Sequence, residues 1–419
     1  MREAFQHRGM RLLFVANLVS MIGSGMNAAA VIWFILQATG SEVSLGLLVA
    51  LQTLPSLVLL PFTGVIIDRE DRRHVMMWLD VARGLIILIV AGLALLHRVQ
   101  VWQLYGMTIL VAVGFWMFWP TINALVQELA PLEKLVDFNS LMLAAVQGGW
   151  VLAGAVVGFL YNKIGLGGIL LLDCATYAVS IACVYQVRKG RVTVTHLKPT
   201  EEKAAPEGTV ARYLHELVEG IRYVHSRKQV RLLGLAWSLF IAAMMTQGVI
   251  SAPLSDRILH RGAVGYGWLN AGWAFGAFTS MFYASQFIRR NGAHRSVTLT
   301  MCVIALALLL LPQIPWIVVA VPIYFVMGSG RGIGGIAIQS EMMELVPKYY
   351  MGRAQNTFFF LSSALQIVTA MIAGEAAHRD GLRFGFYIVS AMYFGAATMA
   401  WRAVRAAEEV MAEEQTEAD

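Results

Sequence analysis

Gly64-Val65-Ile66-Ile67-Asp68-Arg69-Glu70-Asp71-Arg72-Arg73 is a charged segment that lies between two long apolar runs. Its pattern is G-x-x-x-D-R-x-x-R-R, and its charged residues follow directly after residues that hydrocarbon would accept. A membrane protein uses such a segment to end one helix, turn tightly on one side of the bilayer and begin the next helix. The segment therefore predicts two membrane helices joined by a short polar turn.

The composition of the whole chain supports this interpretation. Of the 419 residues, 58% are hydrophobic and only 14% are charged, and the mean hydropathy is +0.63. Soluble domains carry about a quarter of charged residues, so lipid must face much of this chain. The net charge of +6 comes from basic residues in short loops beside apolar runs, as is usual in membrane proteins. We therefore expect no nucleic-acid partner.

The chain has no pattern that is typical of an enzyme. Its three cysteines, Cys174, Cys183 and Cys302, all lie within apolar runs, where cysteine acts as a small buried apolar residue. Neither a CxxC or HExxH pattern nor a P-loop or nucleophile elbow is present. We predict that the protein is not an enzyme and uses no metal and no cofactor.

Apolar runs of about 20 residues, the length that crosses a bilayer, recur along the chain. We predict an all-α membrane protein with twelve transmembrane helices in two six-helix pseudo-repeats. The first run lacks a convincing cleavage site, so we expect a retained helix and not a signal peptide. The predicted spans are residues 11–37, 43–67, 75–96, 101–125, 139–161, 167–187, 230–252, 266–288, 296–312, 315–338, 354–375 and 384–404.

One long polar connection divides these spans into two sets of six. Residues 1–187 form the predicted N-terminal bundle, 188–229 a cytoplasmic linker, 230–405 the C-terminal bundle and 406–419 an acidic tail. Within the linker, Tyr213–Val224 has apolar side chains on one helical face and charged ones on the other. This pattern fits a helix on the membrane surface or a solvated linker helix.

The distribution of Lys and Arg predicts the orientation. An even number of spans places both termini on one side, and the loops on that side carry most of the basic residues, including Arg69, Arg72 and Arg73. Basic loops remain in the cytoplasm. We therefore expect a multi-pass protein with both termini in the cytoplasm.

A short motif recurs in the two halves. Glu128-Leu-Ala-Pro131 follows the fourth span and Glu344-Leu-Val-Pro347 follows the tenth, 216 residues later. The loop after the eighth span has Arg289 at the position that corresponds to Asp68, so the charged segment is kept in one half only. Two parallel six-helix halves around a central site are a known plan of secondary transporters.

The charged segment, the twelve predicted spans and the repeat together resemble the major facilitator superfamily over essentially the whole chain. Four features resemble its drug:proton antiporter-3 group, which includes macrolide-efflux and enterobactin-exporter-like proteins. They are Asp80-x-x-Arg83, the loop from Glu128 to Asn139, Asp173, and Gly220-Ile-Arg-Tyr223. The resemblance implies a monomer in a bacterial inner membrane that carries a small molecule through the lipid bilayer, with protons as the coupling partner.

The resemblance also implies roles for the charged segment. Gly64 would allow a close helix approach, and Asp68 would latch the halves together by contacting the start of the eleventh span, near Arg353. Arg69, Arg72 and Arg73 would fix the loop against headgroups and neighbouring acids. Alternatively, the segment only sets the topology and has no gating role.

Ionisable residues inside predicted spans are functional candidates because charge in hydrocarbon is costly. Asp80 and Arg83 are three residues apart on one helix and can pair, either as a structural pair or as part of a relay. No acid stands clearly at the middle of a span. Glu341, Asp173 and Glu375 are the candidates for proton coupling.

Arg331 is an unusual cation in the glycine-rich stretch Gly328-Ser-Gly-Arg-Gly-Ile-Gly-Gly335. Three roles are open: it binds an anionic group of the substrate, it pairs with Glu341 or Glu344 as a cytoplasmic gate, or it extends to lipid headgroups. The glycines leave space around the guanidinium in each case.

A central site would be lined by aromatic and amide side chains, which suit a bulky amphipathic ligand. Each of these residues has an alternative role at the lipid interface or in helix packing. The candidate lining residues are Asn17, Asn27, Gln52, Trp116, Trp119, Asn123, Gln147, Trp150, Gln247, Asn270 and Trp273.

The fifth span has a glycine-rich stretch similar to the antiporter motif of the superfamily, but it lacks the expected proline.

These patterns predict a proton-coupled exporter of a hydrophobic or amphipathic compound, such as a drug or siderophore, that works by alternating access. The alternative is a facilitator, flippase or importer of a lipid-like or anionic metabolite. A receptor or scaffold that transports nothing is a third class, which no appended soluble domain supports.

Overall fold

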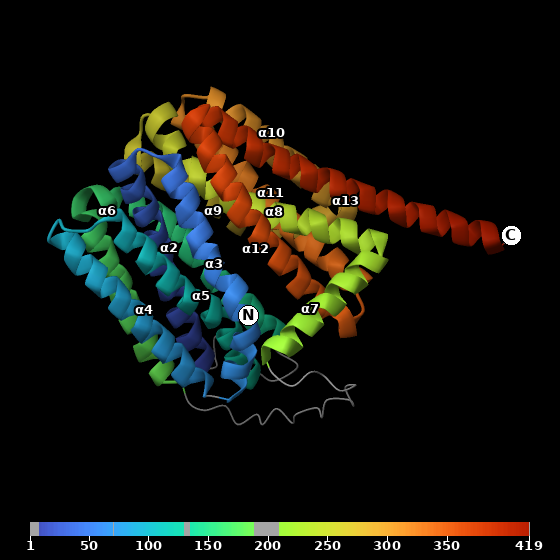
Figure 1. Cartoon of the computed structure of the whole chain (residues 1–419), viewed down its shortest axis with the longest axis horizontal. Helices are drawn as coiled ribbons and strands as arrows, with labels where there is room; N and C mark the ends of the chain where they lie inside the picture. The colour runs from blue at the N-terminus through green and yellow to red at the C-terminus, as the bar shows by residue number, and fades with distance from the viewer. Residues whose placement is uncertain (1–7, 70, 130–134, 188–208, 419) are drawn as a thin grey trace. The chain divides into compact units, whose positions relative to one another are not determined.

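A computed structural model describes residues 8–69, 71–129, 135–187 and 209–418, and the described chain is built of helices (Figure 1). Long apolar runs form helices in lipid because only a helix or a closed barrel satisfies every backbone N–H and C=O there. The helices are α2 (Arg8–Thr39), α3 (Glu42–Arg69), α4 (Arg72–Leu95), α5 (Val101–Leu129), α6 (Leu135–Tyr185), α7 (Thr209–Ser226), α8 (Lys228–Pro253), α9 (Gly262–Asn291), α10 (Ala293–Leu310), α11 (Ile317–Leu345), α12 (Lys348–Arg379) and α13 (Leu382–Ala418), with a π-turn at Leu254–Ile258 and a 3-10 turn at Leu311–Gln313.

Ten helices within the described residues are long and apolar enough to cross a membrane. The predicted all-helical membrane class is therefore confirmed, whereas the count of twelve spans stays a prediction. Two further predicted spans, 139–161 and 266–288, coincide with the first part of α6 and with α9. The 51 residues of α6 are two helices joined at Gly165, whose φ of 63° lies in the left-handed region that glycine adopts without strain.

The chain divides into two compact units. One comprises Met1–Thr39 and Leu51–Arg212, and the other comprises Gly40–Ala50 and Tyr213–Asp419. The start of α3 thus groups with the second unit, although the predicted boundary between the halves lies far later in the chain. In the first unit α6 packs against α2 and α4, and α4 packs against α5; in the second, the main pairs are α9 with α11, α8 with α12 and α13, and α10 with α11 and α13.

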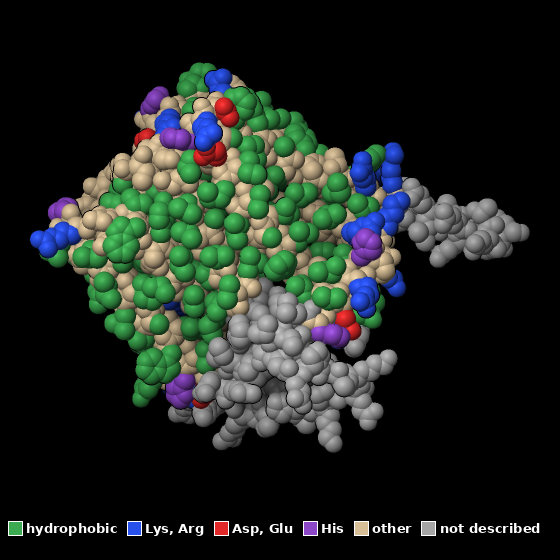
Figure 2. All heavy atoms as spheres, viewed as in Figure 1, with side chains coloured by type: hydrophobic (Ala, Val, Ile, Leu, Met, Phe, Trp, Pro, Cys, Tyr) green, Lys and Arg blue, Asp and Glu red, His purple; other side chains and the backbone are tan. Residues whose placement is uncertain are grey.

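Large apolar side chains remain exposed along the flanks of the helices. Trp78, Phe282 and Val318 are more than two-thirds exposed. On the face seen in Figure 2, hydrophobic side chains cover the middle of the helices, and most charged side chains gather near the helix ends. A surface of this kind suits lipid and not water.

The linker helix α7 docks on the start of α12 within the second unit (Figure 1). A Cβ atom on Gly220 would come within 2.6 Å of the Arg353 carbonyl oxygen, so the backbones approach closely. Val218 and Ile221 on α7 are about half exposed, while Leu217 is buried. At the other end of this unit, α13 continues as a helix through the predicted acidic tail to Ala418.

Candidate functional site

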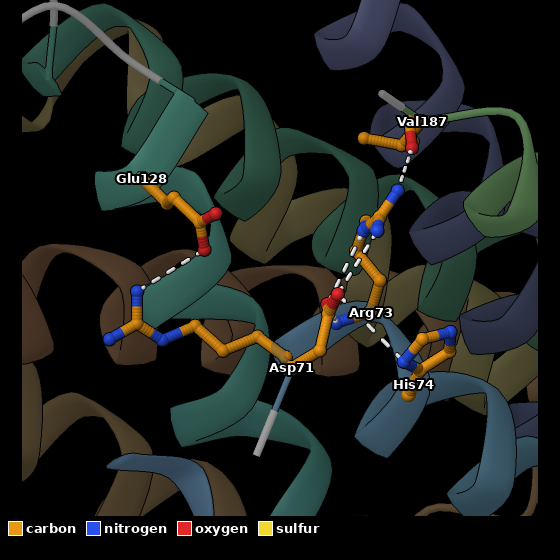
Figure 3. Close-up of polar contacts among 6 residues, drawn as sticks. Asp71, Arg73, His74, Glu128 and Val187 are labelled. Atoms are coloured by element: carbon orange, nitrogen blue, oxygen red, sulfur yellow. Dashed lines mark hydrogen bonds and ion pairs between the residues drawn. The ribbon is translucent and has the colours of Figure 1, made fainter. Parts of the chain in front are cut away.

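The charged segment of residues 64–73 covers the end of α3 and the start of α4, and ion pairs fix its second half (Figure 3). Asp71 caps α4 by accepting a hydrogen bond from the Arg73 backbone N–H. The Arg73 guanidinium pairs with Asp71 at 3.0 Å and donates to the Val187 carbonyl oxygen at 2.6 Å. Arg72 pairs with Glu128 at the end of α5 at 3.3 Å. These contacts join the ends of α4, α5 and α6.

The first half of the segment is not described at the level of side chains. Gly64, Asp68 and Arg69 lie outside the described side chains, so the expected latch stays a prediction. Arg353, near its expected partner site, is held within the second unit. It forms an ion pair with Glu219 of α7 at 3.0 Å, next to a ring stack of Tyr223 on Tyr350 at 4.4 Å.

Asp80 and Arg83 form a fully buried ion pair in α4. The hydroxyl of Ser180 in α6 donates to the other oxygen of Asp80 at 2.7 Å. The guanidinium of Arg83 also lies over the rings of Phe118 and Tyr177, at 4.8 and 4.6 Å from the ring centres. A buried charge is tolerated when it is paired and hydrogen-bonded. Both members of this pair are hydrogen-bonded, and Nη1 of Arg83 is the one guanidinium nitrogen that has no hydrogen-bond partner in the described chain.

Small residues and helix length place this pair deep in the first unit. Arg83 lies eleven residues after the start of α4 and twelve before its end, because α4 begins at Arg72. A Cβ atom on Gly114 would lie 2.7 Å from the Arg83 side chain, so the glycine of α5 provides the space that the arginine occupies. The pair is therefore more central than the predicted span suggested.

A second buried acid, Asp173, lies beside this pair. The amide of Asn27 in α2 donates to Asp173 at 2.7 Å, and Thr176 donates to its other oxygen at 3.3 Å. Asp173 is fully buried and interacts electrostatically with Arg83. A Cβ atom on Gly23 would lie 2.4 Å from the Asp173 carboxylate, so α2 approaches α6 closely here. Asp173 is thus the predicted coupling candidate that takes part in a buried polar network.

Arg331 stands at the middle of α11 in the second unit, fourteen residues from each end. Its Nε donates to the sulfur of Met244 in α8 at 2.8 Å, and its guanidinium lies 4.9 Å from the ring centre of Trp273 in α9. Within the described chain, no carboxylate forms an ion pair with it. Arg331 also interacts electrostatically with the buried Tyr393 of α13. None of these three partners is a carboxylate.

The other two coupling candidates have nearby basic partners. Glu341 is buried and pairs with His294 at the start of α10. Glu375 pairs with Arg379 one turn later on α12, and both of these side chains are well exposed. Arg331 is therefore not the partner that the structure gives Glu341.

Sequence reasoning did not single out a buried acid at the start of α3. Glu42 is fully buried and lies 2.5 Å from Arg257 and 3.3 Å from His378, all within the second unit. A Cβ atom on Gly374 would lie 2.7 Å from the Glu42 carbonyl oxygen, so α3 and α12 are in close contact there. The only signal in the sequence was an acid directly before an apolar run, which is common at loops.

The candidate lining residues make several different kinds of contact. Asn27 and Trp273 belong to the two networks above. Asn17 is buried against the Met142 carbonyl, Trp116 donates to the Gln52 carbonyl, and Asn270 donates to the Tyr266 carbonyl. Gln247 is buried, and Asn123, Gln147 and Trp150 are half-buried, while Trp119 lies outside the described side chains.

The described residues contain no group of three or more His, Cys, Asp or Glu side chains that could hold a metal ion. The two networks differ in their chemistry. Asp173 with Asn27 can hold or release a proton inside the first unit, and Arg331 with Trp273 can receive an anion inside the second. Neither arrangement has a nucleophile and base in contact.

Comparisons with known proteins agree with a transporter. The profile of the Major Facilitator Superfamily matches residues 13–370. Macrolide efflux protein A of Streptococcus pyogenes is 25% identical over 238 residues, which are 56% of this chain and 55% of that protein. The multidrug efflux pump Tap of Mycolicibacterium fortuitum is 23% identical over 393 residues, 90% of this chain and 91% of the pump.

The fold is similar to solved transporters. The crystal structure of the nucleoside transporter NupG superposes with a TM-score of 0.72 at 11% identity, and the match covers 96% of this chain and 99% of that one. These matches confirm that the protein is a membrane transporter and not an enzyme. Because the superfamily profile matches most of its length, the chain belongs to the Major Facilitator Superfamily.

Proposed function

We propose that this protein exports a hydrophobic or amphipathic small molecule, such as a drug or siderophore, in exchange for protons. The observation that carries the proposal is the buried Asp173, which is held by Asn27 and lies in the electrostatic field of Arg83. An intramembrane acid with a specific partner is a functional site by default. The names of the relatives, macrolide and multidrug efflux proteins, support the direction of transport.

Asp173 would work by changing its charge. The ionised carboxylate accepts the hydrogen bond from Asn27, and a protonated carboxyl would have no charge to interact with Arg83. Protonation from outside and release to the cytoplasm would therefore bias how tightly α2 is held against α6. A ligand or proton shifts an equilibrium only by what it binds differently in the two states.

Alternating access would follow the superfamily plan, with twelve spans and rocking of residues 1–187 against 230–405 around a central site. The candidate lining residues would contact the cargo. Asp68 would latch the cytoplasmic side when the site opens outward, with Arg72 and Arg73 holding the loop in place through Glu128, Asp71 and Val187.

A second candidate function is a facilitator, flippase or importer of a lipid-like or anionic metabolite. Arg331 favours it, because a central cation without a carboxylate partner in the described chain suits a negatively charged substrate. The two functions differ in whether protons drive the transport.

Transport into proteoliposomes tests the proposal. Uptake of a cationic dye, a macrolide, a siderophore and a lysolipid would be measured with a pH gradient of either sign and with none. We expect accumulation of at least one compound to depend on the sign of the gradient. Asp173→Asn should lose this dependence, while exchange of labelled for unlabelled substrate continues, because only the proton step is removed.

Asp380→Asn is the matched control, since Asp380 is an exposed carboxylate at the end of α12. Glu341→Gln and Glu375→Gln test the competing coupling candidates. Transport that ignores the gradient in the wild type would contradict proton coupling. Loss of the dependence in Glu341→Gln or Glu375→Gln, with Asp173→Asn unaffected, would move the coupling site away from Asp173.

A further inference from the structure

Arg331 has hydrogen-bond donors that the described protein does not use. A guanidinium carries five N–H donors, and here only Nε has a partner, the thioether sulfur of Met244, which is a weak acceptor. The ring of Trp273 offers its face but no oxygen. The buried Tyr393 of α13 interacts with Arg331 electrostatically, and the described chain shows no hydrogen bond between the two. The two terminal nitrogens therefore have the geometry that binds a carboxylate or a phosphate through two parallel hydrogen bonds.

Arg331 lies at the middle of α11, and its side chain contacts two neighbouring helices. With fourteen residues on either side, the guanidinium lies about 21 Å along the helix from both ends, at 1.5 Å per residue. At this level of the helix the side chain contacts Met244 of α8 and Trp273 of α9. Glu341 was one of the two acids with which Arg331 was expected to form a gate. In the described chain Glu341 pairs with His294 instead.

Close packing of α9 against α11 surrounds Arg331. A Cβ atom on Gly328 would lie 1.9 Å from the Trp273 carbonyl oxygen, and one on Gly276 would lie 2.0 Å from the Phe325 carbonyl oxygen. Gly328 is about one turn from Arg331 and Phe325 is six residues from it, so both glycines bring α9 and α11 together near the arginine. The close approach places Trp273 of α9 beside α11, where its ring lies 4.9 Å from the guanidinium.

From these observations we propose that Arg331, Trp273 and Met244 form a subsite for the oxyanion, a carboxylate or a phosphate, of an amphipathic substrate. This inference rests on the proposed transport of an amphipathic compound, and it specifies that the compound carries a negative charge. Arg331 binds the oxyanion, and the half-buried Trp273 and Met244 contact the adjoining apolar part. A flexible thioether and a flat ring adapt to apolar groups of different shape.

Binding to the purified protein in an uncharged detergent tests the subsite without any transport step. The probes are dansyl-labelled undecanoic acid and its primary amide, which differ only in the charged group, and the readout is dansyl fluorescence. The wild type should bind the acid more tightly than the amide. Arg331→Gln should weaken binding of the acid by about 10-fold or more, as expected for hydrogen bonds to a charged group, and leave the amide unchanged.

Arg331→Lys should keep part of the preference, because a lysine supplies the charge but not the two parallel donors. Arg290→Gln, which removes an exposed arginine at the end of α9, should behave as the wild type. Competition then identifies the source of the oxyanion. Displacement of the probe by phosphatidylglycerol assigns a lipid phosphate, and displacement only by short alkyl carboxylates assigns a soluble acid.

Equal loss of both probes in Arg331→Gln, at an unchanged melting temperature, would overturn the subsite, and so would equal affinity for both probes in the wild type. These outcomes are separate from those of the transport assay. Proton-driven export of a cationic or neutral compound, without any preference for the acid, would leave the proposed function standing and remove the subsite. Preference for the acid without any effect of the pH gradient would do the reverse.

Discussion

Two arginines lie at the middle of membrane helices, one in each unit, and they differ in burial and in the charge of their partners. Arg83 is 1% exposed, and it is paired with the buried Asp80. Arg331 is only partly buried, and its partners are Trp273, Met244 and Tyr393, none of which is a carboxylate. This difference is why we assign Arg83 to the structure of the first unit and propose a ligand site at Arg331.

The comparison also explains why a membrane protein keeps both residues. A charged side chain at the centre of a membrane helix costs about 2.5–3.5 kcal/mol on insertion scales. For Arg83 this cost is offset locally by Asp80 and by two aromatic rings. For Arg331 the described chain supplies the Trp273 ring and an interaction with Tyr393 but no carboxylate, so under our proposal a substrate anion would complete the site.

The largest expected effect comes from removing the counterion of Arg83. Asp80→Asn leaves the guanidinium buried without a negative charge, and breaking a buried ion pair in this way costs about 3–5 kcal/mol. We expect a clear fall in the melting temperature of the purified protein and in its yield in the membrane. The double variant Asp80→Asn/Arg83→Gln should recover much of the loss, because it removes the unpaired charge.

An unchanged melting temperature in Asp80→Asn would show that Arg83 does not depend on its partner. The two arginines would then be alike, and the comparison would fail.

The next effect concerns the close contact of Gly328 in α11 with the Trp273 backbone in α9. Gly328→Ala places a methyl group against the Trp273 carbonyl oxygen, and overpacking of this kind costs about 1–3 kcal/mol. Gly335→Ala on the same helix meets nothing within 4 Å and should have no cost. Thermal unfolding of the two variants measures the difference, and equal melting temperatures would contradict the close contact of α9 and α11.

A smaller effect of opposite sign is expected at Arg331 itself. Arg331→Met removes the insertion cost of a central arginine, about 2.5–3.5 kcal/mol, and loses a desolvated cation–π contact of about 2 kcal/mol. The net result should be a gain on the order of 1 kcal/mol in stability, together with loss of binding to the carboxylate probe. A fall in the melting temperature as large as that of Asp80→Asn would indicate a structural partner for Arg331.

The smallest effect is expected at His378, a third basic residue. Like Arg83 it has a carboxylate partner, but unlike Arg83 its side chain is not buried. His378 is about half exposed and shares the buried Glu42 with Arg257, which remains as a counterion if His378 is lost. Exposed ion pairs contribute about 0–1 kcal/mol, so His378→Gln should shift the melting temperature little. A fall in the melting temperature as large as that of Asp80→Asn would contradict this account.

Much of the fold could be predicted from the sequence. Apolar runs of membrane length indicated where helices lie, and the family resemblance rested on motifs that need no tertiary information. The depth of charged residues was harder to predict, because the end of an apolar run was taken as the end of a span. The helix that carries Arg331 continues past polar residues to Leu345, which moves the arginine from the far part of the predicted span to the centre of α11.

Partners from distant segments could not be predicted at all. The spacing of Asp80 and Arg83 is local and readable, but Asn27 and Asp173 are 146 residues apart in sequence. Glu42 was missed for the same reason, since its partners lie on α12 and just after α8. Local patterns predict helices and pairs within a helix, and only packing shows which buried charge is neutralised.

The most direct test of the central claim compares the two arginines in one binding measurement. The ratio of affinities for the carboxylate and amide probes would be determined for the wild type, for Arg331→Gln and for Asp80→Asn/Arg83→Gln. We predict that the ratio falls to about one in Arg331→Gln, because the roughly 10-fold preference expected from a hydrogen bond to a charged group is lost. The ratio should be preserved in the double variant. A ratio that is preserved in Arg331→Gln and lost in the double variant would contradict the account.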